Sequence, residues 1–555
     1  MKKTLIVILC IAILTACVPA QQPTQPVVMP SPIPPTATPT STPSLPDALW
    51  ISPAVPESLS QLARTWDIPI TEDPNLATQK LDIFDPGSLW IFALVAPFPT
   101  VMDEVIFQEL SAAWQGGQTG PMGGRGILMA ESTLRAFAAV WGEPAAGAVR
   151  VASSGELLDR AWSESTWAII PFEEIQPKWK VLSIDGQNPI HKDFVADPYP
   201  LKIKFGLSDL YSFALPRTNR DETKLATVVL TGVTAMVRAT ALTMELKGVT
   251  YPGSLESGDW LREADVAHIS NEVTFDKTCP YPRSGSTSLI LCSDPKYMEL
   301  LLNVGTDIVE MSGDHLLDRG GTALIDTLNI YKENNIPYYG GGMNAEDARK
   351  PVLMEVNGNK LAFMGCNGKP EIFQKATDTT PGPAKCDYEF FDEQIRALKS
   401  QGYMVIFTFQ HNECYSGKPC YLHDEGFRSV ADSGAVVVSG SQAHFPHIME
   451  FRGDSFLHYG LGNLFFDQML YNAPGGQVIE GTRREFMDRH IFYDGRYLGV
   501  ELLTTMMEDY SIPRPMIKEE REPFLTEYFT LSGWTPIISQ VVPVPTLTPT
   551  PIAIP

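Results

Sequence analysis

The side chains best suited to chemistry follow a β-branched run late in this 555-residue chain. The run 435–439 leads into Gly440 and then into Gln442, His444 and His447. Imidazole and amide groups bind metals, and imidazole also carries protons. A strand that ends in such groups delivers them to the carboxyl edge of an α/β sheet, where catalytic sites form.

Carboxylate, amide and imidazole groups also follow other apolar runs of the chain. They are Glu272, Asp314, His315, Asp318, Gln410 and His411. Because the carboxyl ends of parallel strands meet at one edge of a sheet, we expect these groups to converge with His444. Such a convergence is what a one-metal or two-metal hydrolytic site requires.

The elements that must position these groups alternate between strand and helix, which is typical of an α/β fold. We predict strands over 225–230, 266–270, 307–311, 351–356, 361–364, 404–409 and 435–439. We predict helices over 295–303, 321–334, 391–400 and 425–433.

The chain is too long for one hydrophobic core, and its composition divides it into segments. Residues 18–46 are mostly Pro, Thr, Ser and Gln, which predicts an extended tether. Residues 541–555 have a similar composition and predict a disordered tail. Between them we predict a first domain over 47–215, a second over 224–505 and a C-terminal extension over 506–540.

Residues 1–17 have the form of a bacterial lipoprotein signal peptide. Lys2 and Lys3 precede an apolar core, and Leu-Thr-Ala-Cys at 14–17 matches a lipobox. We therefore expect Cys17 to be lipidated and to anchor the protein on the extracytoplasmic side of the cell membrane. A plain secretory signal that happens to contain Cys17 is the alternative. No other segment reaches the roughly 18 apolar residues that span a bilayer.

Charge and composition limit the partners. The chain has 42 Lys and Arg against 65 Asp and Glu, a formal net charge of −23. Such a surface repels nucleic acid and anionic polymers unless metal ions or a basic patch intervene, so we expect no nucleic-acid partner. The apolar fraction of 44% and the charged fraction of 19% are those of ordinary globular proteins, enzymes included.

Six cysteines lie beyond Cys10 and Cys17, and in an exported chain they predict up to three disulfides. Six cysteines allow 15 connectivities, and short loops favour Cys279 with Cys292, Cys366 with Cys386, and Cys414 with Cys420. A zinc site is disfavoured because the chain has no C-x-x-C pair.

Phrases at 96–100, 167–172 and 199–201 resemble those of periplasmic substrate-binding proteins of the phosphate-binding kind. The resemblance implies that the first domain is a smaller α/β domain of that type. Ser132 and Thr133 then have two interpretations. They hold an anion at a helix N-terminus, or they cap the helix without a ligand.

Four motifs of the second domain occur in a known order. They are Ala264-Asp265 with Glu272, Asp314-His315-x-x-Asp318-x-Gly320, Gly440-x-x-Ala443-His444 with Glu450, and Tyr459-Gly460-Leu461-Gly462-Asn463. Over residues 225–468 the chain resembles the CapA-type capsule or poly-γ-glutamate synthesis proteins. The resemblance implies a calcineurin-like metallophosphoesterase fold, which is an α/β/β/α sandwich.

The resemblance also implies roles. Glu272, Asp314 and His444 stand at metal-ligand positions, and His315 stands where the related phosphoesterases keep a general acid or charge stabiliser. Asp318 is expected to orient His315. His444 is also expected to act on the scissile group.

The chain departs from the family pattern at three ligand positions. Val233 replaces the first aspartate, and Gln410 and Gln442 replace histidines. His411 stands one position along, on the other face of an extended segment. Because Gln410 and Gln442 offer amide oxygens in place of imidazoles, the ligand set, with His411 as a further candidate, favours Mg²⁺, Mn²⁺ or Ca²⁺ over Zn²⁺.

Each of these residues also has a purely structural explanation. Asp314 would cap a helix beginning near Leu316, and Glu272 would pair with Arg238. His458 would be a core histidine. Motifs of other enzymes, such as G-x-S-x-G, a Walker loop and H-E-x-x-H, are absent from the sequence.

Two functions remain open. The first is a metal-dependent hydrolase or transferase acting on a phosphoester, or on an amide of a cell-envelope polymer. The second is a binding or scaffold protein in which the fold has lost catalysis and its cleft holds an envelope polymer or a small anion.

Overall fold

The computed structural model describes residues 47–118, 123–208, 215–286, 288–370, 374–420, 423–441, 443–469, 471–472 and 478–538. The predicted signal peptide with Cys17, the tether, the tail and Gln442 lie outside the described residues. Within the described ranges, no helix combines the length and apolar character needed to cross a membrane.

The first region is mixed α/β, as predicted. Its main sheet has the order β1-β2-β6-β4-β5, with β7 and β9 also paired to β2. Its strands are β1 (Leu49–Ile51), β2 (Gln79–Pro97), β3 (Glu104–Val105), β4 (Ile127–Met129), β5 (Val149–Val151), β6 (Ala168–Pro171), β7 (Trp179–Val181), β8 (Ser183–Ile184) and β9 (Lys202–Leu207). Its helices are α1 (Glu57–Arg64), α2 (Phe107–Trp114), α3 (Glu131–Trp141) and α4 (Ser154–Glu164).

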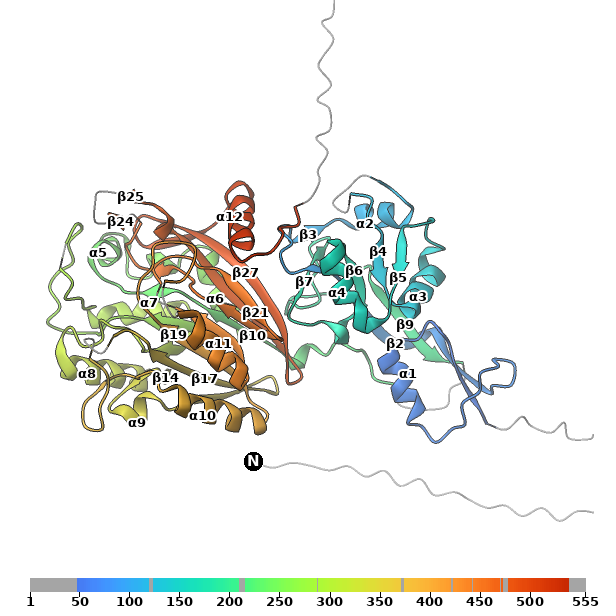
Figure 1. Ribbon diagram of the computed structural model, residues 1–555, viewed down its shortest axis with the longest axis horizontal. Coiled ribbons are helices and arrows are strands. Elements are labelled where there is room, and N and C mark those ends of the chain that lie inside the picture. The colour runs from blue at the N-terminus through green and yellow to red at the C-terminus, as the bar shows by residue number, and fades with distance from the viewer. Residues whose placement is uncertain are drawn as a thin grey trace, which may run out of the picture. The chain divides into compact units, whose positions relative to one another are not determined.

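The second region contains two large sheets (Figure 1). The nine-stranded sheet has the order β14-β13-β12-β10-β26-β27-β28, with β11 paired to β12 and β23 paired to β11. Its strands are β10 (Leu225–Leu230), β11 (Val233–Thr234), β12 (Val266–Asn271), β13 (Thr306–Glu310), β14 (Tyr338–Tyr339), β23 (Asn463–Phe465), β26 (Arg484–Tyr493), β27 (Arg496–Glu508) and β28 (Ile512–Pro515).

The six-stranded sheet has the order β16-β17-β19-β20-β22-β21. Its strands are β16 (Val352–Val356), β17 (Asn359–Asn367), β19 (Met404–Gln410), β20 (Ala435–Gly440), β21 (Met449–Arg452) and β22 (Ser455–His458). Two small two-stranded sheets pair β15 (Gly341–Gly342) with β18 (Gly382–Pro383) and β24 (Tyr471–Asn472) with β25 (Val478–Ile479). The helices are α5 (Arg238–Lys247), α6 (Glu256–Arg262), α7 (Met298–Asn303), α8 (Gly320–Glu333), α9 (Ala345–Ala348), α10 (Tyr388–Ser400), α11 (His423–Ser433) and α12 (Lys518–Leu531).

The second region has four layers, because the two sheets stack on each other and helices cover their outer faces. Alternate residues of β10, such as Val228 and Leu230, join Ile406 of β19 in a core between the sheets. Val229 faces the opposite way, into a core that α5 to α8 cover. Phe407 likewise faces α10 and α11. Because successive side chains of a strand point to opposite faces, continuous apolar runs form strands that are buried on both sides. The predicted α/β/β/α sandwich is confirmed.

The predicted strands and helices of the second region are all present, with ends shifted by a few residues. The predicted end at residue 505 is corrected, because β27 continues to Glu508 and β28 and α12 follow. Phe524 and Tyr528 of α12 belong to the core between the sheets. Residues 506–531 therefore complete the sandwich and do not form a separate extension.

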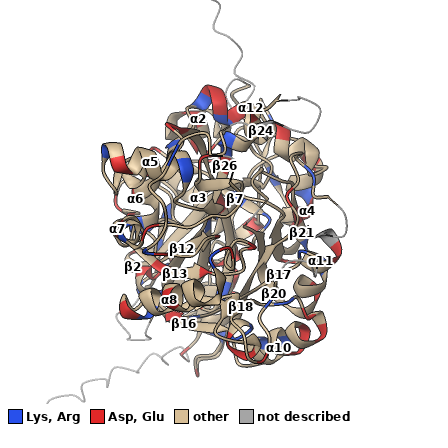
Figure 2. Ribbon diagram, turned by 90° about the vertical axis from the view of Figure 1, so that its left-hand side faces the viewer, with Lys and Arg blue, Asp and Glu red and all other residues tan. Residues whose placement is uncertain are grey.

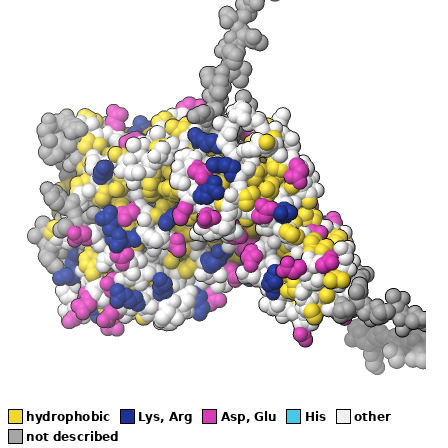
Figure 3. All heavy atoms as spheres, turned by 45° about the vertical axis from the view of Figure 1, so that its right-hand side comes forward, with side chains coloured by type: hydrophobic (Ala, Val, Ile, Leu, Met, Phe, Trp, Pro, Cys, Tyr) yellow, Lys and Arg dark blue, Asp and Glu magenta, His cyan; other side chains and the backbone are white. Residues whose placement is uncertain are grey.

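The three predicted disulfides are confirmed. They join Cys279 to Cys292, Cys366 to Cys386 and Cys414 to Cys420. Acidic and basic residues are interspersed along the ribbon in Figure 2, and their side chains are interspersed on the molecular face in Figure 3. The excess negative charge is therefore not gathered into one patch on the face that Figure 3 draws.

Candidate metal centre

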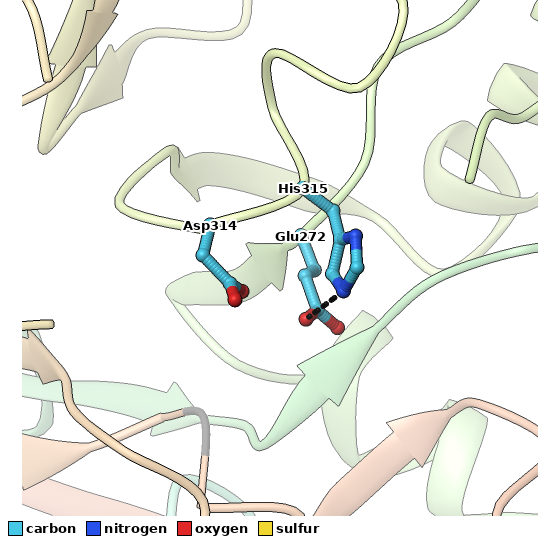
Figure 4. Close-up of side chains that lie close together, drawn as sticks. All are labelled: Glu272, Asp314 and His315. Atoms are coloured by element: carbon cyan, nitrogen blue, oxygen red, sulfur yellow. Dashed lines mark ion pairs between the residues drawn. The ribbon is translucent and has the colours of Figure 1, made fainter. Parts of the chain in front are cut away.

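The ends of three strands bring four of the predicted side chains together. Glu272 follows β12, Asp314 and His315 follow β13, and His444 follows β20. Ligand atoms of Glu272, Asp314 and His315 all lie within 4.8 Å of one another (Figure 4). Since β12 and β13 belong to the nine-stranded sheet and β20 to the six-stranded sheet, the centre is built from both.

Glu272 is the central residue of this group. Its side chain is 1% exposed, and neither carboxylate oxygen has a hydrogen-bond partner among the described residues. Burying an unpaired carboxylate is costly unless a cation accompanies it. The Nε2 atoms of His315 and His444 each lie 3.7 Å from Glu272 Oε1, which is too long for a hydrogen bond. Two bonds of about 2.1 Å to one ion span such a gap, so these residues fit a metal.

Both imidazoles are held so that Nε2 faces Glu272. His315 Nδ1 lies 2.6 Å from Asp318 Oδ2, and the backbone N–H of Leu291 donates to the same oxygen at 2.7 Å. Leu291 precedes Cys292, which the disulfide ties to Cys279. A carboxylate behind the imidazole is the arrangement that metal-ligating histidines usually have.

His444 has an amide in the corresponding place. Its Nδ1 lies 2.8 Å from Asn463 Oδ1, while Asn463 Nδ2 donates to the backbone oxygens of His444 and Thr482. Because the amide nitrogen is used in this way, Oδ1 is the acceptor and His444 Nδ1 carries the proton. The backbone of His444 has a φ of 51°, a left-handed conformation that non-glycine residues seldom adopt outside functional sites.

Asp314 lies between the centre and a set of donors from the six-stranded sheet. Its Oδ1 accepts from Gln410 Nε2 at 2.6 Å and its Oδ2 from Lys369 Nζ at 2.5 Å. Burial would raise the pKa of Asp314, but the positive charges of Lys369 and His315 lower it to about 2. Asp314 is therefore ionised at neutral pH.

Negative charge around the imidazoles favours their protonated forms. Burial would lower the pKa of His315, but its hydrogen bond to Asp318 and the charges of Glu272 and Asp314 raise it to about 9. Burial also opposes protonation of His444, whose pKa is raised chiefly by Glu272. An incoming metal must displace these protons.

Two predicted ligands, Gln410 and His411, have other contacts in the structure. The oxygen of Gln410 accepts a hydrogen bond from Asn367 Nδ2 at 2.5 Å while its nitrogen bonds Asp314, so its polar atoms serve the network around Asp314. The ring of His411 stacks on Phe409 and Phe427, with centroids 5.0 and 5.7 Å away, in the outer aromatic layer of the sheet. Alternation along the extended segment places Gln410 and His411 on opposite faces.

The purely structural roles expected for Asp314, Glu272 and His458 are found in the structure for His458 alone. The capping role for Asp314 is wrong, because α8 begins at Gly320 after Arg319. Arg238 pairs with Asp467 at 2.6 Å and not with Glu272. His458 is a core histidine, fully buried and 2.6 Å from Asp488.

The interpretation of Ser132 and Thr133 as caps is also wrong. The N-cap of α3 is Ala130, and the buried Thr133 hydroxyl has no hydrogen-bond partner within the described part of the chain.

Lys369 and Asn367 were missed by the sequence prediction. Asn367 ends β17 and Lys369 follows it, and the signal was the same as for the other sites, namely polar residues at the end of an apolar strand. Asn463 belongs to the motif at 459–463, but its contact with His444 depends on the fold.

Comparisons with known proteins place this centre in context. Residues 227–468 match the family model "Bacterial capsule synthesis protein PGA_cap". "PGA biosynthesis protein CapA" of Bacillus subtilis (strain 168) is 24% identical over 204 residues, which are 37% of this chain and 53% of the relative. "Capsule biosynthesis protein CapA" of Bacillus anthracis is 23% identical over 199 residues, 35% of this chain and 48% of the relative.

The chain thus spans about half the length of these curated relatives. Among solved structures, the 5'-nucleotidase precursor from Thermus thermophilus has a TM-score of 0.30 and 14% identity, covering 56% of this chain and 58% of that one. The family match and both curated relatives confirm the resemblance found in the sequence: residues 227–468 are similar to the CapA-type capsule synthesis proteins.

Proposed function

We propose that this protein is a metal-dependent hydrolase or transferase that acts on a cell-envelope polymer such as capsule or poly-γ-glutamate. The observation that carries the proposal is the buried carboxylate of Glu272, which has no hydrogen-bond partner among the described residues and is faced by two imidazoles. The names of the similar proteins support the choice of polymer.

The geometry favours a specific division of roles. Glu272, Asp314 and His315 hold the ion, because their ligand atoms form one mutual group. When bound, a divalent ion polarises the scissile group and activates water. His444 faces Glu272 from the other side and, held through Nδ1, exchanges a proton with the reacting group at Nε2. This division exchanges the roles that the resemblance implied for His315 and His444.

The donor set also changes the expected metal. Two carboxylates and one imidazole, with a second imidazole nearby, suit Mn²⁺ or Zn²⁺ as well as Mg²⁺. The preference for Mg²⁺, Mn²⁺ or Ca²⁺ depended on amide ligands, and the polar atoms of Gln410 are used elsewhere.

The proposed location is the extracytoplasmic side of the cell membrane, with an anchor at the lipidated Cys17. The lipobox supports this location, and so do the three disulfides, which persist in oxidising compartments. The proposed partners are the membrane and the polymer, not nucleic acid.

The test measures bound metal and turnover in the same samples. Purified chain lacking residues 1–17 is dialysed against Mn²⁺, Zn²⁺ or Mg²⁺, analysed for metal, and assayed on a phosphodiester and on poly-γ-glutamate. We expect Glu272→Gln and His315→Ala to lose metal and activity, and His444→Ala to lose activity while keeping metal.

Glu485→Gln is the matched control. Glu485 is a fully buried carboxyl on β26 that bonds Thr505 and does not belong to the centre. The variant should behave as the wild type does. Wild-type protein without bound metal or turnover would favour the scaffold function instead.

A second binding activity is proposed for the first region. The Thr133 hydroxyl, buried at the start of α3 and without a described partner, supports capture of a small anion by the helix N-terminus. Titration with inorganic phosphate tests it. Thr133→Val, which keeps the shape, should abolish binding, and an equal affinity in both proteins would contradict the proposal.

A further inference from the structure

A buried ammonium group lies beside the candidate metal centre. Lys369 follows β17 in a turn where its backbone N–H donates to Asn367 Oδ1 at 2.9 Å. Its side chain is 5% exposed. Nζ lies 2.5 Å from Asp314 Oδ2 and 3.4 Å from Glu413 Oε1. The ammonium group is therefore fixed between two carboxylates.

The lysine makes the two carboxylates of the centre unequal. Both oxygens of Asp314 already accept hydrogen bonds, one from Gln410 and one from Lys369. Neither oxygen of Glu272 does so within the described part of the chain. A cation can therefore still enter beside Glu272 and His315, where Asp314 completes the ligand group, while at Asp314 Oδ2 the protein itself supplies a positive charge.

Other residues around Asp314 offer little to a metal. The polar atoms of Gln410 are used within the network. Elsewhere around the centre, Val233 is fully buried in an apolar cluster with Phe466, the residue that stacks on His444, and it has no ligand atom. A divalent ion placed against Asp314 Oδ2 would meet the ammonium group at contact distance, where two positive charges repel most strongly.

We propose that Lys369 acts as a built-in cation that takes the place of a second metal, so that the centre binds one divalent ion per chain. This inference rests on the proposed function, since it assumes that the ligand group at Glu272 binds a metal. The centre would then hold one metal ion among Glu272, Asp314 and His315, with the ammonium group of Lys369 next to Asp314.

The test counts ions. Metal-free protein is titrated with Mn²⁺ by calorimetry, and the bound manganese is examined by electron paramagnetic resonance. We expect one Mn²⁺ per chain, with the spectrum of an isolated ion. Lys369→Met keeps the length of the side chain and removes the charge, and we expect it to bind Mn²⁺ at least tenfold more tightly or to take up a second ion.

Lys180→Met is the control, because Lys180 is a partly buried lysine, 16% exposed, that pairs with Asp103 at 2.6 Å outside the centre. Its stoichiometry and affinity should equal those of the wild type.

Two ions per wild-type chain, or unchanged or weaker binding in a folded Lys369→Met, would overturn the inference and leave the proposed function in place. No ion in the wild type would overturn both. If Lys369→Met does not fold, the wild-type stoichiometry still decides.

Discussion

At the scale of single residues, Asp318 shows how a side chain outside the ligand group controls the centre. It accepts from His315 Nδ1 and from the backbone of Leu291, so it fixes the direction in which His315 Nε2 points. Such supporting partners commonly change metal affinity by 10- to 100-fold.

We therefore predict that Asp318→Ala weakens Mn²⁺ binding by about 10- to 100-fold, as measured by calorimetry. Asp318→Asn retains an acceptor oxygen and should lose less. If both variants bind as the wild type does, Asp318 does not orient the ligand.

The sequence alone predicted some of the side chains of the centre and missed others. Glu272, Asp314, His315 and His444 were found because each follows an apolar strand. Gln410 and His411 were predicted as ligands, and the structure gives them other contacts, because Gln410 accepts a hydrogen bond from Asn367 and His411 stacks on Phe409. Lys369 was missed because its role depends on β17 and β13 belonging to different sheets that meet at Asp314.

At the scale of elements, β10 and β26 show what sequence patterns can and cannot predict. β10 is an uninterrupted apolar run and was predicted at its observed ends. β26 was missed because Asp488 and His490 interrupt its apolar pattern. Both are fully buried, and each has one contact to a residue that only the fold brings near, Asp488 to His458 and His490 to Tyr497.

The backbone of Gly440, at the end of β20, lies so close to the backbone of Tyr459 that a side chain on Gly440 can be used to test this packing. A Cβ atom on Gly440 would lie 2.1 Å from the backbone oxygen of Tyr459. We predict that Gly440→Ala lowers the free energy of unfolding by about 1–3 kcal/mol in urea denaturation, because the backbone must shift. It should also weaken metal binding, since His444 lies four residues on.

Gly155→Ala is the control for this substitution. Gly155 lies in the first turn of α4, and a Cβ atom there would meet nothing within 4 Å. We expect no loss, or a gain of about 0.5–1 kcal/mol. An equal loss in both variants would show that close packing is not the cause.

At the scale of the whole molecule, residues of the first region directly contact the sandwich of the second region. Phe98 packs against Phe451, Phe456 and Trp534, with ring centroids 5.1, 5.5 and 5.6 Å away. His191 Nε2 lies 2.7 Å from Glu501 Oε1 on β27. The two regions should therefore contribute to each other's stability.

The His191–Glu501 pair predicts a pH dependence. Burial would lower the pKa of His191, but Glu501 raises it. The contribution of this ion pair to the free energy of unfolding is therefore fully present below about pH 6.5, and it is lost as pH rises through the pKa of His191 in the folded protein. Burial would raise the pKa of Glu501, but His191 lowers it to about 2, so that contribution is lost only in strong acid.

We predict that His191→Gln destabilises the metal-free protein by about 1 kcal/mol at pH 6 and by much less at pH 9, as measured by thermal unfolding. Glu501→Gln and the double variant complete a mutant cycle. A loss that is the same at both pH values would contradict the charge-based explanation.

The loop closed by Cys279 and Cys292 has a consequence for where the protein matures. Leu291, next to Cys292, holds Asp318, and Asp318 holds His315. In a newly made chain with reduced thiols this loop is not closed covalently. Asp318 therefore orients His315 less firmly in such a chain. We expect the dithiothreitol-reduced protein, or Cys279→Ser with Cys292→Ser, to bind Mn²⁺ more weakly than the oxidised protein. Oxidation would then act as the step that readies the centre, so that an exported chain acquires its ion from the environment in which it will work and not from the cytoplasm that made it.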